Sequence, residues 1–167
     1  MRAEGSANDG AMTLLCAYLY RLSAGLLLGA AVYFAAVAAP AAFPREVAAL
    51  PPGHPLRTAA ANLVGSQLAA LDRMTLLFCA LSALCAIALA RMGMASARLA
   101  AVPVLLAGLC ALVSSSFVTP RIHALREAGQ TQLPEFGRLH AISTGLVGIE
   151  ILLYLVALWV APAPAKG

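Results

Sequence analysis

The sequence predicts an all-α integral membrane protein folded as an antiparallel four-helix bundle. Of its 167 residues, 62% are hydrophobic and only 11% are charged, whereas a soluble domain carries roughly 25% charged residues. The apolar residues also occur in blocks long enough to cross a bilayer, which takes about 20 residues of helix. These blocks lack the alternation of a membrane β-strand. The composition and the blocks together exclude a water-soluble globule.

Four apolar blocks place the helices. Charge-free stretches cover 22–43, 74–90 and 99–120, and a fourth over 139–165 is interrupted only by Glu150. They predict one transmembrane domain, 12–161, with helices over about 13–43, 58–90, 99–120 and 138–161. Residues 1–11 are small and polar, so they are expected to form a flexible N-terminal tail, and 162–167 a C-terminal tail.

The basic residues fall at both ends of the predicted bundle. The end that carries both termini, here called the terminal end, has Arg2, Arg91, Arg98 and Lys166. The opposite end, here called the loop end, has Arg45, Arg57, Arg121, Arg126 and Arg138. This balance leaves the orientation open, and we expect a bacterial inner membrane protein with cytoplasmic termini. Because the charges are dispersed, nucleic acid is not an expected partner.

Polar residues within the spans are expected to face the bundle interior. A charge near the bilayer centre costs at least ~2.5–3.5 kcal/mol, so it normally points inward and has a partner. On the fourth helix, a stripe roughly 120° wide contains His140, Ser143, Thr144, Glu150 and Tyr154. On the second helix, a similar stripe contains Asn62, Gly65, Ser66, Asp72 and Arg73. Both stripes are therefore predicted to point inward.

Two contacts follow from these stripes. Arg21 and Glu150 lie at similar depths, about 13 and 16 Å from the terminal end, so an ion pair or a contact with a protonated acid is predicted, with Arg73 as the competing partner. His140 is predicted to join the polar groups of the second helix at the loop end, in the best candidate for a functional site. The predicted intramembrane polar cluster comprises Arg21, Asn62, Ser66, Asp72, Arg73, His140, Ser143, Thr144 and Glu150.

Histidines raise the alternative of a bound cofactor. His54, His123 and His140 all map to the loop end, the first two in loops and the third in a helix. Neutral imidazole can ligate a metal, so His140 is a candidate ligand for haem b or a transition metal. The simpler interpretation is a hydrogen bond that anchors the start of the fourth helix.

The remaining motifs bear on activity and assembly. No phosphate-binding loop, zinc-protease or acyl-transfer motif occurs, so no enzymatic activity is predicted. The four cysteines lie within helices and are expected to be small hydrophobic residues. Gly25 and Gly29 form a GxxxG motif, which could make a contact between helices of the bundle or a seam between two copies.

Three segments carry a resemblance to a known family: 34–43, 118–126 and 136–143. They resemble bacterial relatives of the transmembrane protein 205 family, four-span membrane proteins whose domain has no assigned function, over residues 13–161. The most specific match is the pattern formed by Phe136, Arg138, His140 and Ser143. More distantly, the sequence is reminiscent of copper-resistance D-type proteins, some of which bind haem through helical histidines. It lacks an obvious second axial histidine within a helix.

Three functions stay open at this point. The first is a small transport or tolerance factor that handles a metal, a proton or a small solute through the inward polar stripe. The second is a structural or accessory subunit of a larger membrane complex, and the third is a haem- or metal-binding membrane protein. The expected partners are the lipid bilayer and either further copies of the chain or other subunits.

Overall fold

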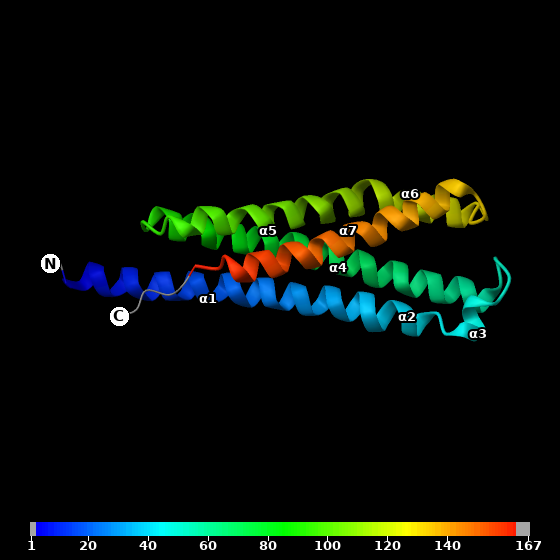
Figure 1. Ribbon diagram of the computed structural model, residues 1–167, viewed down its shortest axis with the longest axis horizontal. Coiled ribbons are helices and arrows are strands. Elements are labelled where there is room, and N and C mark those ends of the chain that lie inside the picture. Colours follow the sequence, from blue (N-terminus) through cyan, green and yellow to red (C-terminus); the bar gives the residue numbers. More distant parts are fainter. Residues whose placement is uncertain (1–2, 163–167) are drawn as a thin grey trace.

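The computed structural model describes residues 3–162, and this part of the chain forms a long antiparallel bundle of helices (Figure 1). Four helical segments in it are long and apolar enough to cross a membrane. No strand occurs within these residues. The predicted all-α four-helix membrane bundle is therefore confirmed.

Each span is built from one or more helices. The first span comprises α1 (Ala3–Tyr33), the π-helical turn η1 (Phe34–Ala38) and α2 (Ala39–Ala42). The short α3 (Arg45–Ala48) leads to the second span, α4 (Pro55–Arg91). The third span comprises α5 (Ser96–Val113), the π-helical turn η2 (Ser114–Val118) and α6 (Thr119–Glu127). The fourth span is α7 (Pro134–Trp159).

The spans are arranged in a ring in chain order. Helix α4 packs between α1 and α5, and α7 closes the ring by packing against both α5 and α1. Helices α4 and α7 consequently face each other across one diagonal, and α1 and α5 across the other. The start of α1 and the end of α7 lie at the same end of the bundle, with α3 at the opposite end (Figure 1).

Small residues form the contacts between the spans. The fully buried alanines are Ala24, Ala31, Ala86, Ala97, Ala100, Ala107, Ala111 and Ala157. Small side chains let helices approach closely where lipid provides no hydrophobic force between them. Large apolar side chains such as Leu77, Leu84 and Phe117 point outward, where the hydrocarbon of the bilayer would cover them. Alanine at the contacts and leucine outside therefore suit this bundle to lipid.

The GxxxG motif does not take part in these contacts. Gly25 and Gly29 are exposed, and a Cβ added to either would meet no other atom within 4 Å. The interpretation of the motif as a contact within the bundle is therefore wrong. A seam between two copies stays a prediction.

The third span extends further than the sequence indicated. It was expected to end at Pro120, but the helix continues to Glu127. A proline lacks the N–H that donates to the carbonyl four residues back, and its ring crowds that carbonyl. In the first and third spans alike, a π-helical turn ends two residues before the proline, at Ala38 before Pro40 and at Val118 before Pro120. The wider turn lets each helix continue through its proline.

The first span also begins earlier than expected. Residues 3–11 were assigned to a flexible tail, but they form the first turns of α1. This segment contains no proline, so nothing in it interrupts a helix that the following span already nucleates. Of the predicted C-terminal tail, 163–167 lie outside the described residues.

Candidate functional site

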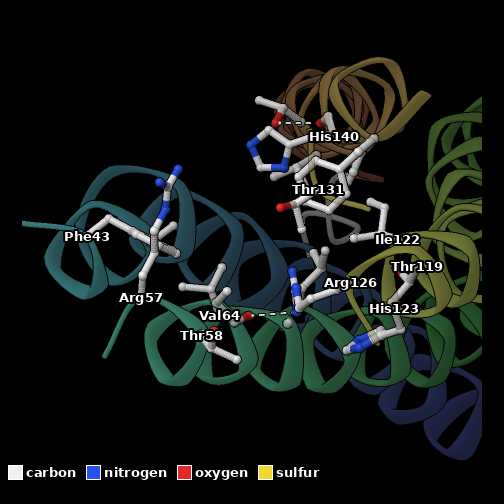
Figure 2. A pocket seen from close by; sticks show the side chains of 18 of the residues that line it. Phe43, Arg57, Thr58, Val64, Thr119, Ile122, His123, Arg126, Thr131 and His140 are labelled. Atoms are coloured by element: carbon white, nitrogen blue, oxygen red, sulfur yellow. Dashed lines mark hydrogen bonds between the residues drawn. The ribbon is translucent and has the colours of Figure 1, made fainter. Parts of the chain in front are cut away.

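A cavity of about 700 Å³ lies at the loop end of the bundle (Figure 2). The first span, α4, α6 and α7 line it, whereas the described residues of α5 do not. Most of its wall is apolar and includes Phe34, Val64, Leu68, Ile122, Phe136, Val147 and Ile151. Its volume falls in the range of about 300–1,000 Å³ that is typical of small-molecule sites.

Cationic and hydroxyl side chains interrupt the apolar wall. The basic groups are Arg57, His123, Arg126 and His140, and the hydroxyl groups are Thr58, Thr119, Thr131, Ser143 and Thr144. Among the described lining residues there is no aspartate or glutamate. The cavity therefore carries a positive charge that no lining carboxylate neutralises.

The two lining arginines are bound to neutral acceptors. Arg57 Nη1 donates to the carbonyl of Leu50 at 2.7 Å. Arg126 Nη1 donates to the carbonyl of Ala61 at 3.1 Å and is 3.5 Å from Asn62 Oδ1. A guanidinium group has more N–H donors than these bonds use. Both arginines thus retain a full charge and spare donors.

The one salt bridge in the described part of the chain lies elsewhere. Arg121 Nε is 2.9 Å from Glu135 Oε1, and both side chains are largely exposed. An exposed pair of this kind contributes little to stability, typically about 0–1 kcal/mol. It leaves the charges of the cavity unchanged.

Gly65 allows α6 to place its basic residues against α4. A Cβ added at Gly65 would lie 3.2 Å from His123 Cε1, 3.3 Å from His123 Nε2 and 3.4 Å from Arg126 Nη1. A side chain at this position would therefore crowd the His123 ring and contact Arg126. His123, which was expected in a loop, instead lies on α6, and its ring packs against the backbone of α4 (Figure 2).

His140 occupies the other side of the cavity, on α7, across from Arg126 (Figure 2). Its ring is parallel to that of Phe136, one turn earlier, with the centroids 6.5 Å apart. Thr144 Oγ1 donates to the His140 carbonyl at 3.0 Å. His54 has a different position: its Nδ1 accepts a hydrogen bond from the Leu56 amide at 3.3 Å and so caps the start of α4.

The predicted stripe on the second helix is only partly correct. Asp72 is buried, but Asn62, Ser66 and Arg73 are exposed, and they do not line the cavity with His140. Asn62 and Ser66 lie in the first part of α4, where polar side chains can reach headgroups and water, so polarity alone does not turn them inward. Arg73 lies midway along α4, beside the buried Asp72, and this explanation does not apply to it. The predicted polar partners of His140 on α4 are therefore wrong. Of the predicted stripe only Gly65 lines the cavity, together with Arg57 and Thr58 of the same helix.

The predicted stripe on the fourth helix is confirmed in its buried part. Ser143, Glu150 and Tyr154 are at most 5% exposed. His140 and Thr144 are exposed, although both line the cavity. This helix places Glu150 deep in the apolar part of the bundle. The functional role of the stripe stays a prediction.

Two buried carboxyl groups lie beneath the cavity. Asp72 on α4 and Glu150 on α7 are each 1% exposed, and they interact electrostatically across the bundle. Asp72 lies one turn beyond Leu68, and Glu150 lies just under one turn beyond Val147, both of which line the cavity. The two carboxyl groups thus lie about one turn below the deepest lining residues of the cavity, toward the centre of the bundle.

The surroundings of this pair are polar but not cationic. Ser114 Oγ donates to Asp72 Oδ2 at 2.9 Å, and the Tyr154 hydroxyl donates to Thr75 Oγ1 at 3.1 Å. Glu150 Oε2 is buried and has no hydrogen-bond partner among the described residues. A carboxyl group in this position lacks the donors that would stabilise a negative charge.

The predicted contact between Arg21 and Glu150 is not formed. The described residues, 3–162, contain no ion pair or hydrogen bond between Arg21 and Glu150. Arg21 is half-buried on the side of α1. The matching depths did not fix the rotation of α1, which turns Tyr20 inward instead. The Tyr20 hydroxyl donates to the carbonyl of Ala100 at 2.6 Å.

A known protein family matches most of the first three spans. A family described as a domain of unknown function (DUF4149) matches residues 22–131, which include Arg57, Gly65, Asp72, His123 and Arg126. No curated protein and no solved structure matches the chain. Since the family match extends over about two thirds of the sequence, the chain belongs to the DUF4149 family.

Proposed function

We propose that the protein binds a small amphipathic anion in the loop-end cavity, as the binding step of a transport or tolerance function. The anion has an apolar body and one carboxylate, phosphate or sulfate group. The observation that carries the proposal is that two arginines, Arg57 and Arg126, line a largely apolar cavity that has no carboxylate among its described lining residues. We also propose, from the resemblance of three sequence segments, that the chain is related to the transmembrane protein 205 family.

The charge of the cavity favours an anionic head group. Charge-assisted hydrogen bonds to arginine are roughly twice as strong as neutral ones, and the planar guanidinium matches a carboxylate or phosphate. On the cavity floor, Thr119 Oγ1 is buried without a hydrogen-bond partner among the described residues. The floor therefore offers a further polar contact to a bound molecule.

The apolar wall favours a hydrocarbon body on the same molecule. Phe34, Leu68 and Ile151 contribute to a surface that would gain about 25 cal/mol for each Å² of apolar area it covers. A simple inorganic anion would use the arginines and leave this wall uncovered. The combination indicates an amphipathic ligand.

A metal or haem receives less support from the geometry. No group of three or more histidine, cysteine, aspartate or glutamate side chains that could hold a metal occurs in residues 3–162. His123 and His140 line the same cavity, but the ring of His123 packs against Gly65. For these reasons we favour a transport or tolerance factor that handles a small solute over a haem- or metal-binding protein.

The first test compares ligands of equal chain length. Octyl phosphate, octylammonium and octanol are added to the protein purified in a non-ionic detergent, and thermal unfolding is followed. A ligand that binds only the folded state raises stability by about 2.7 kcal/mol at a hundred times its Kd. We expect octyl phosphate to raise the Tm and the other two to change it little.

Inorganic phosphate controls for the hydrocarbon chain and is expected to have a weaker effect than octyl phosphate. Equal shifts with all three octyl compounds would contradict the proposal, since they would reflect partitioning into detergent. A Soret band or stoichiometric metal in the untreated sample would favour the cofactor function instead.

A further inference from the structure

We propose that Asp72 and Glu150 form a proton-binding site inside the bundle, in which Glu150 carries the proton and Asp72 is ionised, and that this site exchanges protons with the loop-end cavity. The proposal goes beyond anion binding and does not depend on it. It rests on the burial of both carboxyl groups, on their hydrogen bonds and on their position below the cavity.

Two negative charges are not tolerated at this position. Both side chains are 1% exposed, and no arginine or lysine of the described residues forms an ion pair with either. An unpaired buried carboxylate is costly, and a second one nearby adds repulsion. The pair lowers its energy most simply by keeping one proton.

The hydrogen bonds assign that proton. Asp72 Oδ2 accepts a hydrogen bond from Ser114, which stabilises the ionised form of Asp72. Glu150 Oε2 accepts none. Glu150 is therefore the group that holds the proton, and its unpartnered oxygen is the atom that takes it up.

The other titratable groups around Glu150 add no positive charge. Cys79 of α4 and Cys110 of α5 interact with Glu150, as does Tyr154 of its own helix. From α1, Tyr20 reaches Cys79. Thiols and phenols are neutral near pH 7, so the proton on Glu150 is the direct way to limit the charge.

Access to the site is from the loop end. Leu68 and Val147, which precede Asp72 and Glu150 by about one turn of their helices, line the cavity. Ser114, the partner of Asp72, lies five residues before Thr119, which also lines it. Toward the terminal end the core is closed by Leu27, Ala86 and Leu89, which are at most 1% exposed. The cavity is therefore the opening nearest to the pair among the described residues, and the proposal assigns the exchange of protons to this side.

Infrared spectroscopy tests the site without any ligand. A protonated carboxyl group has a carbonyl stretching band that is separate from the bands of carboxylates. At neutral pH we expect the protein in liposomes to show this band, equivalent to about one carboxyl group per chain, and to lose it at high pH. Glu150→Gln is expected to remove the band. Glu127→Gln, at an exposed acid of α6, is the matched control and is expected to leave it.

A second variant at the same position shows whether loss of the band in Glu150→Gln could come from misfolding. Glu150→Asp keeps a carboxyl group at the site and is expected to retain the band at a changed frequency. The proposal is overturned if the wild-type protein shows no such band at neutral pH, or if the band persists in Glu150→Gln. Loss of the band on adding sodium at constant pH would also overturn it, in favour of a cation site.

Discussion

The variant Gly148→Phe is expected to weaken binding of octyl phosphate more than tenfold while the bundle stays folded. Gly148 lines the cavity, and a Cβ added there would meet no atom within 4 Å. The new ring can therefore enter the space that we assign to the hydrocarbon chain. A tenfold loss corresponds to about 1.4 kcal/mol, which is less than the value of about 1.5–3 kcal/mol for burying one apolar side chain. Titration by isothermal calorimetry measures the change.

Gly145→Phe is the matched control for this prediction. Gly145 lies on the same helix, is exposed, has no atom within 4 Å of an added Cβ and does not line the cavity. Binding is expected to stay within about twofold of the wild type. Equal losses in the two variants would show that the effect does not come from filling the cavity.

Removing both cavity arginines is expected to have the largest effect on anion binding. The double variant Arg57→Gln/Arg126→Gln should weaken octyl phosphate by at least about a hundredfold, because each hydrogen bond to a charged group contributes about 1.5–3 kcal/mol. Any residual binding of octanol should change little, since the apolar wall is intact. Calorimetric titrations of both ligands measure this difference.

Arg138→Gln controls for the overall charge of the loop end. Arg138 is exposed on α7 and does not line the cavity, so its removal should change binding by less than about threefold. Because Arg126 also bonds the carbonyl of Ala61, the single variant Arg57→Gln is measured in parallel and should lose at least about tenfold. Wild-type affinity in the double variant would refute the assignment of the head-group site.

The number and place of the spans could be predicted from the sequence because the thickness of a bilayer sets the length of an apolar helix. The direction of Glu150 and Tyr154 was also predictable, since a polar group deep in a span has no lipid or water to bond. Asn62 and Ser66 lie nearer the loop end of α4, where headgroups and water can bond to a polar side chain that points outward. Their outward orientation could not be read from polarity.

The cavity could not be predicted for two physical reasons. Pro120 was expected to end the third helix, so His123 and Arg126 were assigned to a loop. In the structure they lie one turn apart on the same face of α6. The contact of that face with Gly65 is tertiary and leaves no local pattern in the sequence. The π-helical turn that carries the helix through Pro120 is seen only in the structure.

Photolabelling with an octyl phosphate that carries a diazirine at the end of its chain tests the central claim most directly. After irradiation, labelled residues are identified by mass spectrometry with and without excess octyl phosphate. We predict displaceable labels on the cavity-lining residues within 34–43, 64–68 and 143–151, and none on α5, which does not line the cavity. Labels spread evenly over the outward faces of all four spans, and unaffected by excess octyl phosphate, would contradict an anion-binding cavity.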